Sequence, residues 1–78
     1  MSRRDKIHEI LRGISKKAGT PGDDESLFEA GYIDSFALAD MVSALEEAFG
    51  VTVPDADLNP RKFDSISRIE AYLESRGA

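Results

Sequence analysis

A serine directly follows an aspartate in the segment Gly31-Tyr32-Ile33-Asp34-Ser35-Phe36. Asp34 is a favoured helix N-cap residue, and apolar residues recur at helical spacing from Leu38 onward. The pattern therefore predicts that Ser35 lies in the first turn of an amphipathic helix. Backbone N–H groups in that turn lack intrahelical partners, and the helix end carries partial positive charge. An anionic group esterified to the Ser35 hydroxyl, such as a phosphodiester, suits this position.

The side of this helix that faces away from the core is a candidate partner surface. At about 100° per residue, the core stripe comprises Leu38, Met41, Val42, Leu45 and Phe49. The opposite side carries Phe36, Ala39, Asp40, Ser43 and Glu47. We add Glu46 to the residues expected to contact a partner. An exposed Phe36 beside Ser35 indicates an apolar partner contact, although Phe36 could instead tuck under the preceding loop.

The length and composition of the chain disfavour an enzyme. Its 78 residues predict one domain, spanning residues 1–78, which is too small for a deep catalytic cleft. With no cysteine there is no disulfide framework, thiolate nucleophile or zinc-finger pattern, which suits the cytoplasm. The charged N-terminal segment leads into an amphipathic stretch, so we expect no signal peptide, and no segment is long and apolar enough to span a membrane.

Charge is distributed unevenly along the chain. Residues 1–20 carry six basic and two acidic residues, whereas residues 21–59 carry ten acidic residues and neither lysine nor arginine, within a net charge of −5. Blocks of one sign can simply solvate a surface. Here the acidic block coincides with the serine helix, so we expect it to attract basic proteins and to repel nucleic acid. The basic N-terminal segment is only a weak indication of nucleic-acid binding, and we predict no nucleic-acid partner.

Apolar spacing predicts an all-α fold. A first helix is expected from about Arg3 to Ala18, with Ile7, Ile10, Leu11, Ile14 and Ala18 on its buried side. Gly19-Thr20-Pro21-Gly22 ends it, and a long loop follows over residues 20–34. We expect Leu27, Phe28 and Ile33 to pin that loop onto the helices. Long loops in small domains often carry function.

The second half of the chain completes a small helical bundle. The serine helix should end at Phe49, with Gly50 at the C′ position. Residues 51–53 are expected to be extended, and residues 57–63 to hold one short helical turn capped by Asn59. The last helix should run from Asp64 or Ser65 to about Ser75, burying Ile66, Ile69 and Leu73 with Tyr72 at its edge, and Gly77 should end it. The prediction is three main helices plus one short helix, with a long loop between the first two main helices.

Taken together, these motifs resemble the acyl carrier protein family, also called phosphopantetheine-binding or thiolation domains. The motifs that carry the resemblance are Leu27-Phe28-Glu29-Ala30-Gly31, Asp34-Ser35, Leu45-Glu46-Glu47-Ala48-Phe49-Gly50-Val51 and Val53-Pro54. The resemblance implies that a separate phosphopantetheinyl transferase attaches the 4′-phosphopantetheine arm of coenzyme A to Ser35. The thiol of the arm would then hold acyl or aminoacyl groups as thioesters.

The same resemblance implies a set of partners and a setting. The protein would serve acyl- or aminoacyl-activating and acyl-transferring enzymes in fatty-acid, polyketide, peptide or related specialised biosynthesis. It would be a carrier rather than an enzyme, acting as a monomer in the cytoplasm. Asp34 would help the transferase position magnesium and Ser35, in addition to its role as a helix cap.

Other residues with possible chemistry receive structural interpretations. Asp64-Ser65 repeats the Asp-Ser pair, but it opens the last helix, where Ser65 is expected to be an ordinary cap. His8 is the only histidine and is expected at the surface, without partners for a catalytic base. Tyr32 could shield the arm or anchor the loop. Asp23-Asp24-Glu25 lacks the oxygen spacing of a calcium loop.

Two departures from the family favour a specialised carrier. The residue after the serine is usually leucine or methionine in this family, whereas here it is Phe36, and Asp40 is the only acid in the next few residues. Charge complementarity governs partner choice, so we expect a standalone carrier for a dedicated activating enzyme. A fatty-acid carrier remains an alternative. The rival from another class is a non-covalent helical adaptor that binds proteins through its acidic, Phe36-bearing face.

Overall fold

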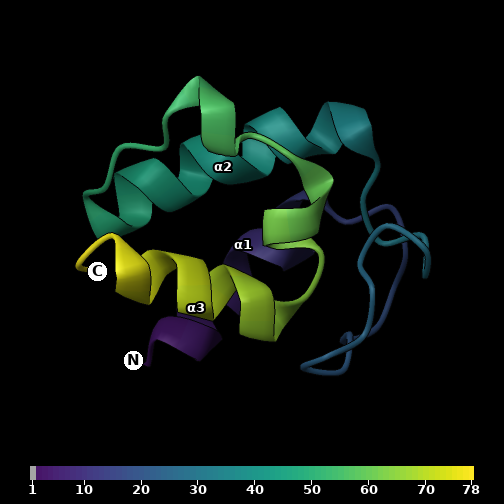
Figure 1. Cartoon of the computed structure of the whole chain (residues 1–78). Helices are drawn as coiled ribbons and strands as arrows, with labels where there is room; N and C mark the ends of the chain where they lie inside the picture. The colour runs from purple at the N-terminus through teal and green to yellow at the C-terminus, as the bar shows by residue number, and fades with distance from the viewer. Residues whose placement is uncertain (1) are drawn as a thin grey trace.

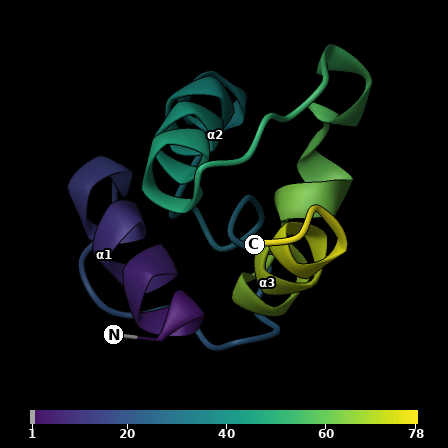
Figure 2. The ribbon, with the colours of Figure 1, turned by 90° about the vertical axis from the view of Figure 1, so that its left-hand side faces the viewer.

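Three helices form the body of the molecule in the computed structural model, which describes residues 2–78. Met1, the first residue of the charged N-terminal segment, lies outside them. The elements are α1 (Arg3–Ile14), α2 (Ser35–Phe49), α3 (Ile66–Ser75) and two short 3₁₀ helices, η1 (Asp55–Asp57) and η2 (Pro60–Phe63). No strand occurs within residues 2–78, which confirms the all-α prediction. Figures 1 and 2 show α1 against both α2 and α3, with η1 and η2 on the connection from α2 to α3.

The core lies where the three helices meet. The buried residues of α2 are Leu38, Met41, Val42 and Leu45, and those of α3 are Ile66, Ile69, Tyr72 and Leu73, so both apolar stripes are confirmed. Phe63 of η2 is fully buried beneath them and packs edge to face against Tyr72, with ring centroids 5.0 Å apart. Within residues 2–78, no helix is long and apolar enough to cross a membrane.

The first helix is shorter than its sequence pattern indicates. It ends at Ile14, and Ala18, predicted to be buried, is exposed. Ser15 adopts an extended conformation with ψ of 139° and accepts a hydrogen bond from the N–H of Lys17 over 3.2 Å. The Lys16 N–H donates to the carbonyl oxygen of Tyr32 rather than to a helical carbonyl, over 2.9 Å. Tertiary hydrogen bonds thus replace the expected last turn.

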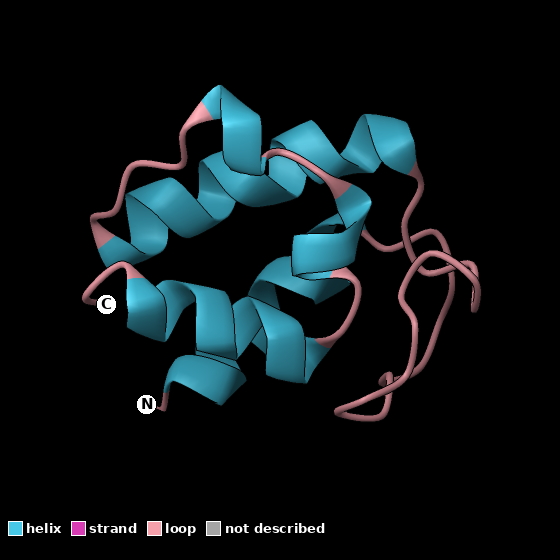
Figure 3. Cartoon of the chain, viewed as in Figure 1, coloured by secondary structure: helices cyan, strands magenta, loops and turns pink. Residues whose placement is uncertain are grey.

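The long loop between α1 and α2, drawn in pink in Figure 3, is pinned to the core by apolar side chains, as predicted. Leu27 and Ile33 are buried, and Phe28 packs partly buried against the core. The Leu27 N–H donates to the Asp64 carbonyl oxygen over 2.6 Å, and the Ser26 hydroxyl donates to the Asp64 carboxylate over 2.7 Å. The loop is therefore attached to the residues just before α3 and to the shared apolar core.

Cap residues determine where the other helices begin or end. Gly50 ends α2 with φ of 66°, a left-handed conformation that glycine adopts at little cost. The side chain of Asn59 caps η2, and that of Ser65, which is 5% exposed, caps α3 by accepting from the Arg68 N–H over 3.1 Å. The 3₁₀ helix η1, which comes before η2 in the chain, was not predicted from the sequence.

Candidate functional site

Ser35 is exposed at the first residue of α2, directly after the long loop. The preceding Asp34 is the N-cap, as predicted, and its Oδ1 accepts from the backbone N–H groups of Phe36 over 3.0 Å and Ala37 over 2.9 Å. The hydroxyl of Ser35 is thus presented to solvent at a helix start whose geometry Asp34 determines.

The second carboxylate oxygen of Asp34 binds a residue that sequence reasoning did not single out. Oδ2 of Asp34 forms an ion pair with Nζ of Lys16. The Lys16 hydrogen bond and the N–H of Ala37 hold the pKa of Asp34 below its usual value, so Asp34 is ionised at neutral pH. Lys16 follows the end of α1 and has no regular spacing to Asp34, so no sequence pattern could have identified it.

The start of α2 is less open to an anion than the sequence predicted. We expected free N–H groups in the first turn. Instead, those of Phe36 and Ala37 bind the Asp34 carboxylate, and that of Leu38 donates to the Asp34 carbonyl oxygen over 3.2 Å. Asp34 therefore occupies donors that would otherwise face a phosphate, and it brings a negative charge that Lys16 balances.

Lys17 and Tyr32 fasten the loop just before the serine. Nζ of Lys17 donates to the Ala30 carbonyl oxygen over 3.0 Å and lies 4.6 Å from the centroid of the Tyr32 ring. Tyr32 is buried, and its carbonyl oxygen accepts from the Lys16 N–H. These contacts support the interpretation of Tyr32 as a loop anchor rather than as a shield for the arm.

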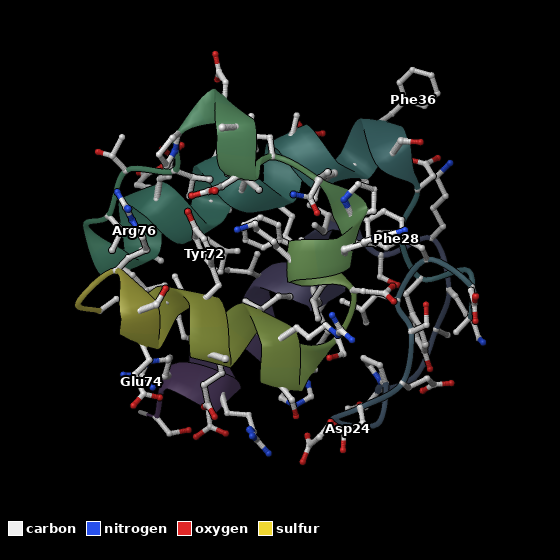
Figure 4. All side chains as sticks on the ribbon, in the orientation of Figure 1. Asp24, Phe28, Phe36, Tyr72, Glu74 and Arg76 are labelled. Atoms are coloured by element: carbon white, nitrogen blue, oxygen red, sulfur yellow. The ribbon has the colours of Figure 1, made fainter. Side chains whose placement is uncertain are left out.

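The predicted partner surface is largely exposed. Phe36 projects from the start of α2 into solvent with 88% of its surface accessible (Figure 4), so it does not tuck under the loop. The other exposed residues of this face are Ala39, Asp40, Ser43 and Glu47. Glu46 differs because it is half-buried and its Oε2 accepts from the Val53 N–H over 2.9 Å. Its carboxylate holds the segment after α2, so we assign Glu46 a structural role.

The remaining candidate residues lie apart from Ser35 or show no site. His8 is half-buried and lines a hollow of about 450 Å³ between α1 and the following loop, and Ser35 is not among the residues that line it. Asp23 pairs with Arg4 over 2.5 Å. Within residues 2–78 no cluster of three or more histidine or acidic side chains is arranged to hold a metal ion.

Comparison with known families shows which family the chain belongs to. The model of the family described as "Phosphopantetheine attachment site" matches residues 5–73, nearly the whole chain. The chain belongs to this family. It is therefore a carrier protein that holds 4′-phosphopantetheine covalently and bears acyl or aminoacyl thioesters on it, and it is not itself a catalyst. We refer to it below as the carrier.

Individual relatives are small carriers of similar length. The carrier is 29% identical over 75 residues to the D-alanyl carrier protein of Lactobacillus acidophilus, covering 96% of the carrier and 95% of that protein. It is 41% identical over 67 residues to the aminoacyl carrier protein of Agrobacterium fabrum, covering 82% and 80% respectively. The D-alanyl carrier protein of Streptococcus mutans is 34% identical over 56 residues.

The residues at the start of α2 fit this cofactor. An exposed hydroxyl is needed to form the phosphodiester, and Ser35 supplies one. The carrier has no cysteine of its own, so the thiol that forms the thioester comes with the arm when it is bound.

Proposed function

We propose that Ser35 is the attachment residue. The observation that carries this proposal is the contrast between the two Asp-Ser pairs of the carrier. Ser35 is exposed at the start of α2, whereas Ser65 is buried and its oxygen accepts the Arg68 N–H. Ser35 is therefore accessible to an enzyme in the folded carrier, whereas Ser65 would become accessible only if the start of α3 unfolded.

A separate transferase would perform the attachment. The Ser35 oxygen would bond to the phosphorus that bears pantetheine in coenzyme A, the phosphoanhydride bond to that phosphorus would break, and adenosine 3′,5′-bisphosphate would leave. The serine proton would pass to a base of the transferase. Asp34 is a poor candidate for that base because one of its carboxylate oxygens binds two backbone N–H groups and the other binds Lys16.

The cargo that we favour is an aminoacyl group. The relatives named above are D-alanyl and aminoacyl carrier proteins, and the first two match 96% and 82% of the carrier respectively. A dedicated aminoacyl-activating enzyme would load the thiol, and a transferring enzyme would unload it. Phe36, Ala39, Asp40, Ser43 and Glu47 would form the surface that both enzymes contact. That the carrier is one domain and acts as a monomer in the cytoplasm stays a prediction.

Mass spectrometry tests the proposed attachment and the proposed cargo in two steps. The carrier is coexpressed with a broad-specificity phosphopantetheinyl transferase, and the intact mass and the peptide containing Ser35 are measured. We expect a single added arm on that peptide. The loaded carrier is then incubated with ATP, amino acids and aminoacyl-activating enzymes, or with fatty acids and acyl-activating enzymes. Aminoacyl but not fatty-acyl thioesters are expected. An unmodified chain would favour the non-covalent adaptor instead.

A further inference from the structure

Lys16 contacts the segment before Ser35 through both its backbone and its side chain. Its N–H donates to the Tyr32 carbonyl oxygen over 2.9 Å, and its ammonium pairs with Oδ2 of Asp34. The neighbouring Lys17 donates to the Ala30 carbonyl oxygen over 3.0 Å. These contacts join the first residues of the long loop to its last residues, immediately in front of α2.

The ion pair between Lys16 and Asp34 has a local rather than a global role. The two side chains are 63% and 37% exposed, and exposed ion pairs contribute little to the free energy of unfolding. The pair does act on the carboxylate that caps α2. With Oδ2 held by Lys16, Oδ1 is directed at the N–H groups of Phe36 and Ala37, the two residues that follow Ser35 in the first turn.

Lys16 also contributes to the charge balance beside the serine. No lysine or arginine occurs in the sequence between Lys17 and Arg61, and the first turn of α2 has no acidic residue of its own. The first-turn N–H groups of α2 are largely occupied by Asp34, as described above. The ammonium of Lys16 therefore balances the carboxylate of Asp34, one residue before the hydroxyl that would become a phosphodiester.

We propose that Lys16 is a positioning residue for the loading of Ser35. Its ammonium holds the Asp34 carboxylate on the first turn of α2, and this fixes the direction in which the Ser35 hydroxyl leaves the helix. This inference rests on the proposed attachment at Ser35. It adds a residue from the end of α1 to a site otherwise composed of consecutive residues.

A positioning role and a purely electrostatic role of Lys16 predict changes in different kinetic constants when the lysine is removed. The carrier has a net charge of −5, so losing one more positive charge should strengthen its attraction to a basic enzyme and lower KM. Loss of positioning should instead lower kcat, because a misplaced nucleophile reacts more slowly once bound. The split between kcat and KM therefore separates the two roles.

The experiment compares Lys16→Gln, Lys16→Arg and the control Lys6→Gln in the full-length carrier. Lys6 pairs with Glu9 one turn along α1 over 3.6 Å, so its substitution removes the same charge without touching Asp34. Initial loading rates with coenzyme A and a broad-specificity transferase give kcat and KM for each carrier. We expect Lys16→Gln to lower kcat about threefold to tenfold, Lys16→Arg to retain most of the kcat, and Lys6→Gln to keep the wild-type kcat while showing any effect of the lost charge on KM.

Amide proton shifts of the unloaded carrier supply a readout that does not depend on the transferase. In Lys16→Gln the amides of Phe36 and Ala37 should shift and exchange faster. The amides of Lys62 and Arg68, which bind two other side-chain caps, Asn59 and Ser65, should not change. Circular dichroism checks folding, and Lys16→Met, which keeps most of the aliphatic stem, replaces Lys16→Gln if that variant is unfolded.

Each outcome decides between the possibilities. A fall in kcat with shifted amides and rescue by Lys16→Arg supports the proposal. The proposal is overturned if Lys16→Gln has an unchanged or higher kcat, or if its kcat falls without amide shifts. It is also overturned if Lys16→Arg does not restore the kcat. If the wild-type carrier itself is not loaded at Ser35, the proposed attachment site is wrong, which is a different result from normal loading of Lys16→Gln.

Discussion

The hydroxyl of Tyr72 donates a hydrogen bond to Oδ2 of Asp57 over 2.8 Å, joining α3 to η1. Nζ of Lys62 lies 3.2 Å from the other oxygen of the same carboxylate, so η2 joins the cluster as well. The Tyr72 ring packs on the buried Phe63. The carboxylate of Asp57 thus joins the segment after α2 to the last helix.

Tyr72→Phe should destabilise the carrier while leaving loading at Ser35 intact. The substitution keeps the ring contact with Phe63 but removes the donor to a charged acceptor, at a cost of about 1 kcal/mol for a partly exposed bond. Denaturant unfolding measures the loss. Tyr32→Phe is the matched control, since the Tyr32 hydroxyl makes no hydrogen bond to residues 2–78 and its removal should change stability less.

Stability should fall in acid, partly because of two carboxylates. Hydrogen bonds from Tyr72 and Lys62 hold the pKa of Asp57 below its usual value. Hydrogen bonds from Lys16 and, to a smaller extent, from the Ala37 N–H lower the pKa of Asp34. A pKa that is lower in the folded state adds stability above the unfolded pKa of about 4. That stability is lost as the pH falls through the folded pKa.

Thermal unfolding between neutral pH and about pH 2.5, below the unfolded carboxyl pKa, measures this dependence. Asp57→Asn should be less stable than wild type at neutral pH and should lose less stability on acidification. Asp55→Asn changes an exposed residue of the same 3₁₀ helix whose carboxylate pairs with no cation among residues 2–78, so its acid profile should match the wild type. Equal profiles for the Asp57 variant and wild type would contradict the assignment.

Ser35→Ala should abolish loading with little change in melting temperature, because its exposed hydroxyl is not part of the core. Ser65→Ala should do the reverse. It should load fully but lose about 0.5–2 kcal/mol of stability, the usual cost of removing a helix cap. Intact mass and thermal unfolding of the two variants provide the comparison, and an arm found on Ser65 would overturn the attachment site.

Phe36→Ala should leave stability within about 0.5 kcal/mol of wild type, as expected for a surface position, because the side chain is 88% exposed. Turnover by partner enzymes should fall about fivefold or more, since a central aromatic anchor typically contributes over 1 kcal/mol to binding. Phe36→Leu, the usual residue of the family, should keep transferase activity but change the preference among downstream enzymes.

Phe63→Ala is the contrasting control. Because Phe63 is fully buried, its truncation should lower the free energy of unfolding of the carrier by about 3–5 kcal/mol. Thermal unfolding and steady-state kinetics measure both properties. Normal turnover of Phe36→Ala by the transferase and by the activating enzyme would show that Phe36 is not a partner contact.

Charge reversal on α2 should slow partner encounter. Asp40→Lys with Glu47→Lys replaces two exposed acids on the Phe36 side of the helix, so kcat/KM with a basic partner should fall while the fold persists. The wild-type rate should itself fall with added salt, because exposed charges are screened over about 10 Å at 0.1 M. Stopped-flow or initial-rate kinetics measure both effects.

A matched control makes the same change in net charge elsewhere. Asp24→Lys with Glu74→Lys alters two exposed acids on the long loop and on α3, which lie far from Phe36 (Figure 4). If both double variants slow the partner enzymes equally, only the net charge matters and α2 is not a specific docking face.

The sequence alone determined the apolar stripes of the helices and the exposure of Ser35 at the start of α2. Apolar residues at helical spacing bury one face wherever the helices pack, so the buried stripes of α2 and α3 follow from the pattern itself. Asp34, Asn59 and Ser65 are caps because their short side chains reach the nearby backbone N–H groups. The same local logic predicted the exposure of Phe36 and the end of α2 at Gly50.

Only the tertiary structure decided how the site is assembled. Ala18 continues the apolar spacing of α1, yet the chain leaves the helix after Ile14 because Lys16 bonds to Tyr32 and Asp34. Glu46 belongs to the acidic block by sequence, but its carboxylate binds the Val53 N–H. Each of these contacts joins residues with no periodic relationship in the chain. Their formation depends on how the long loop and the segment after α2 fold back against the helices, which local propensity does not encode.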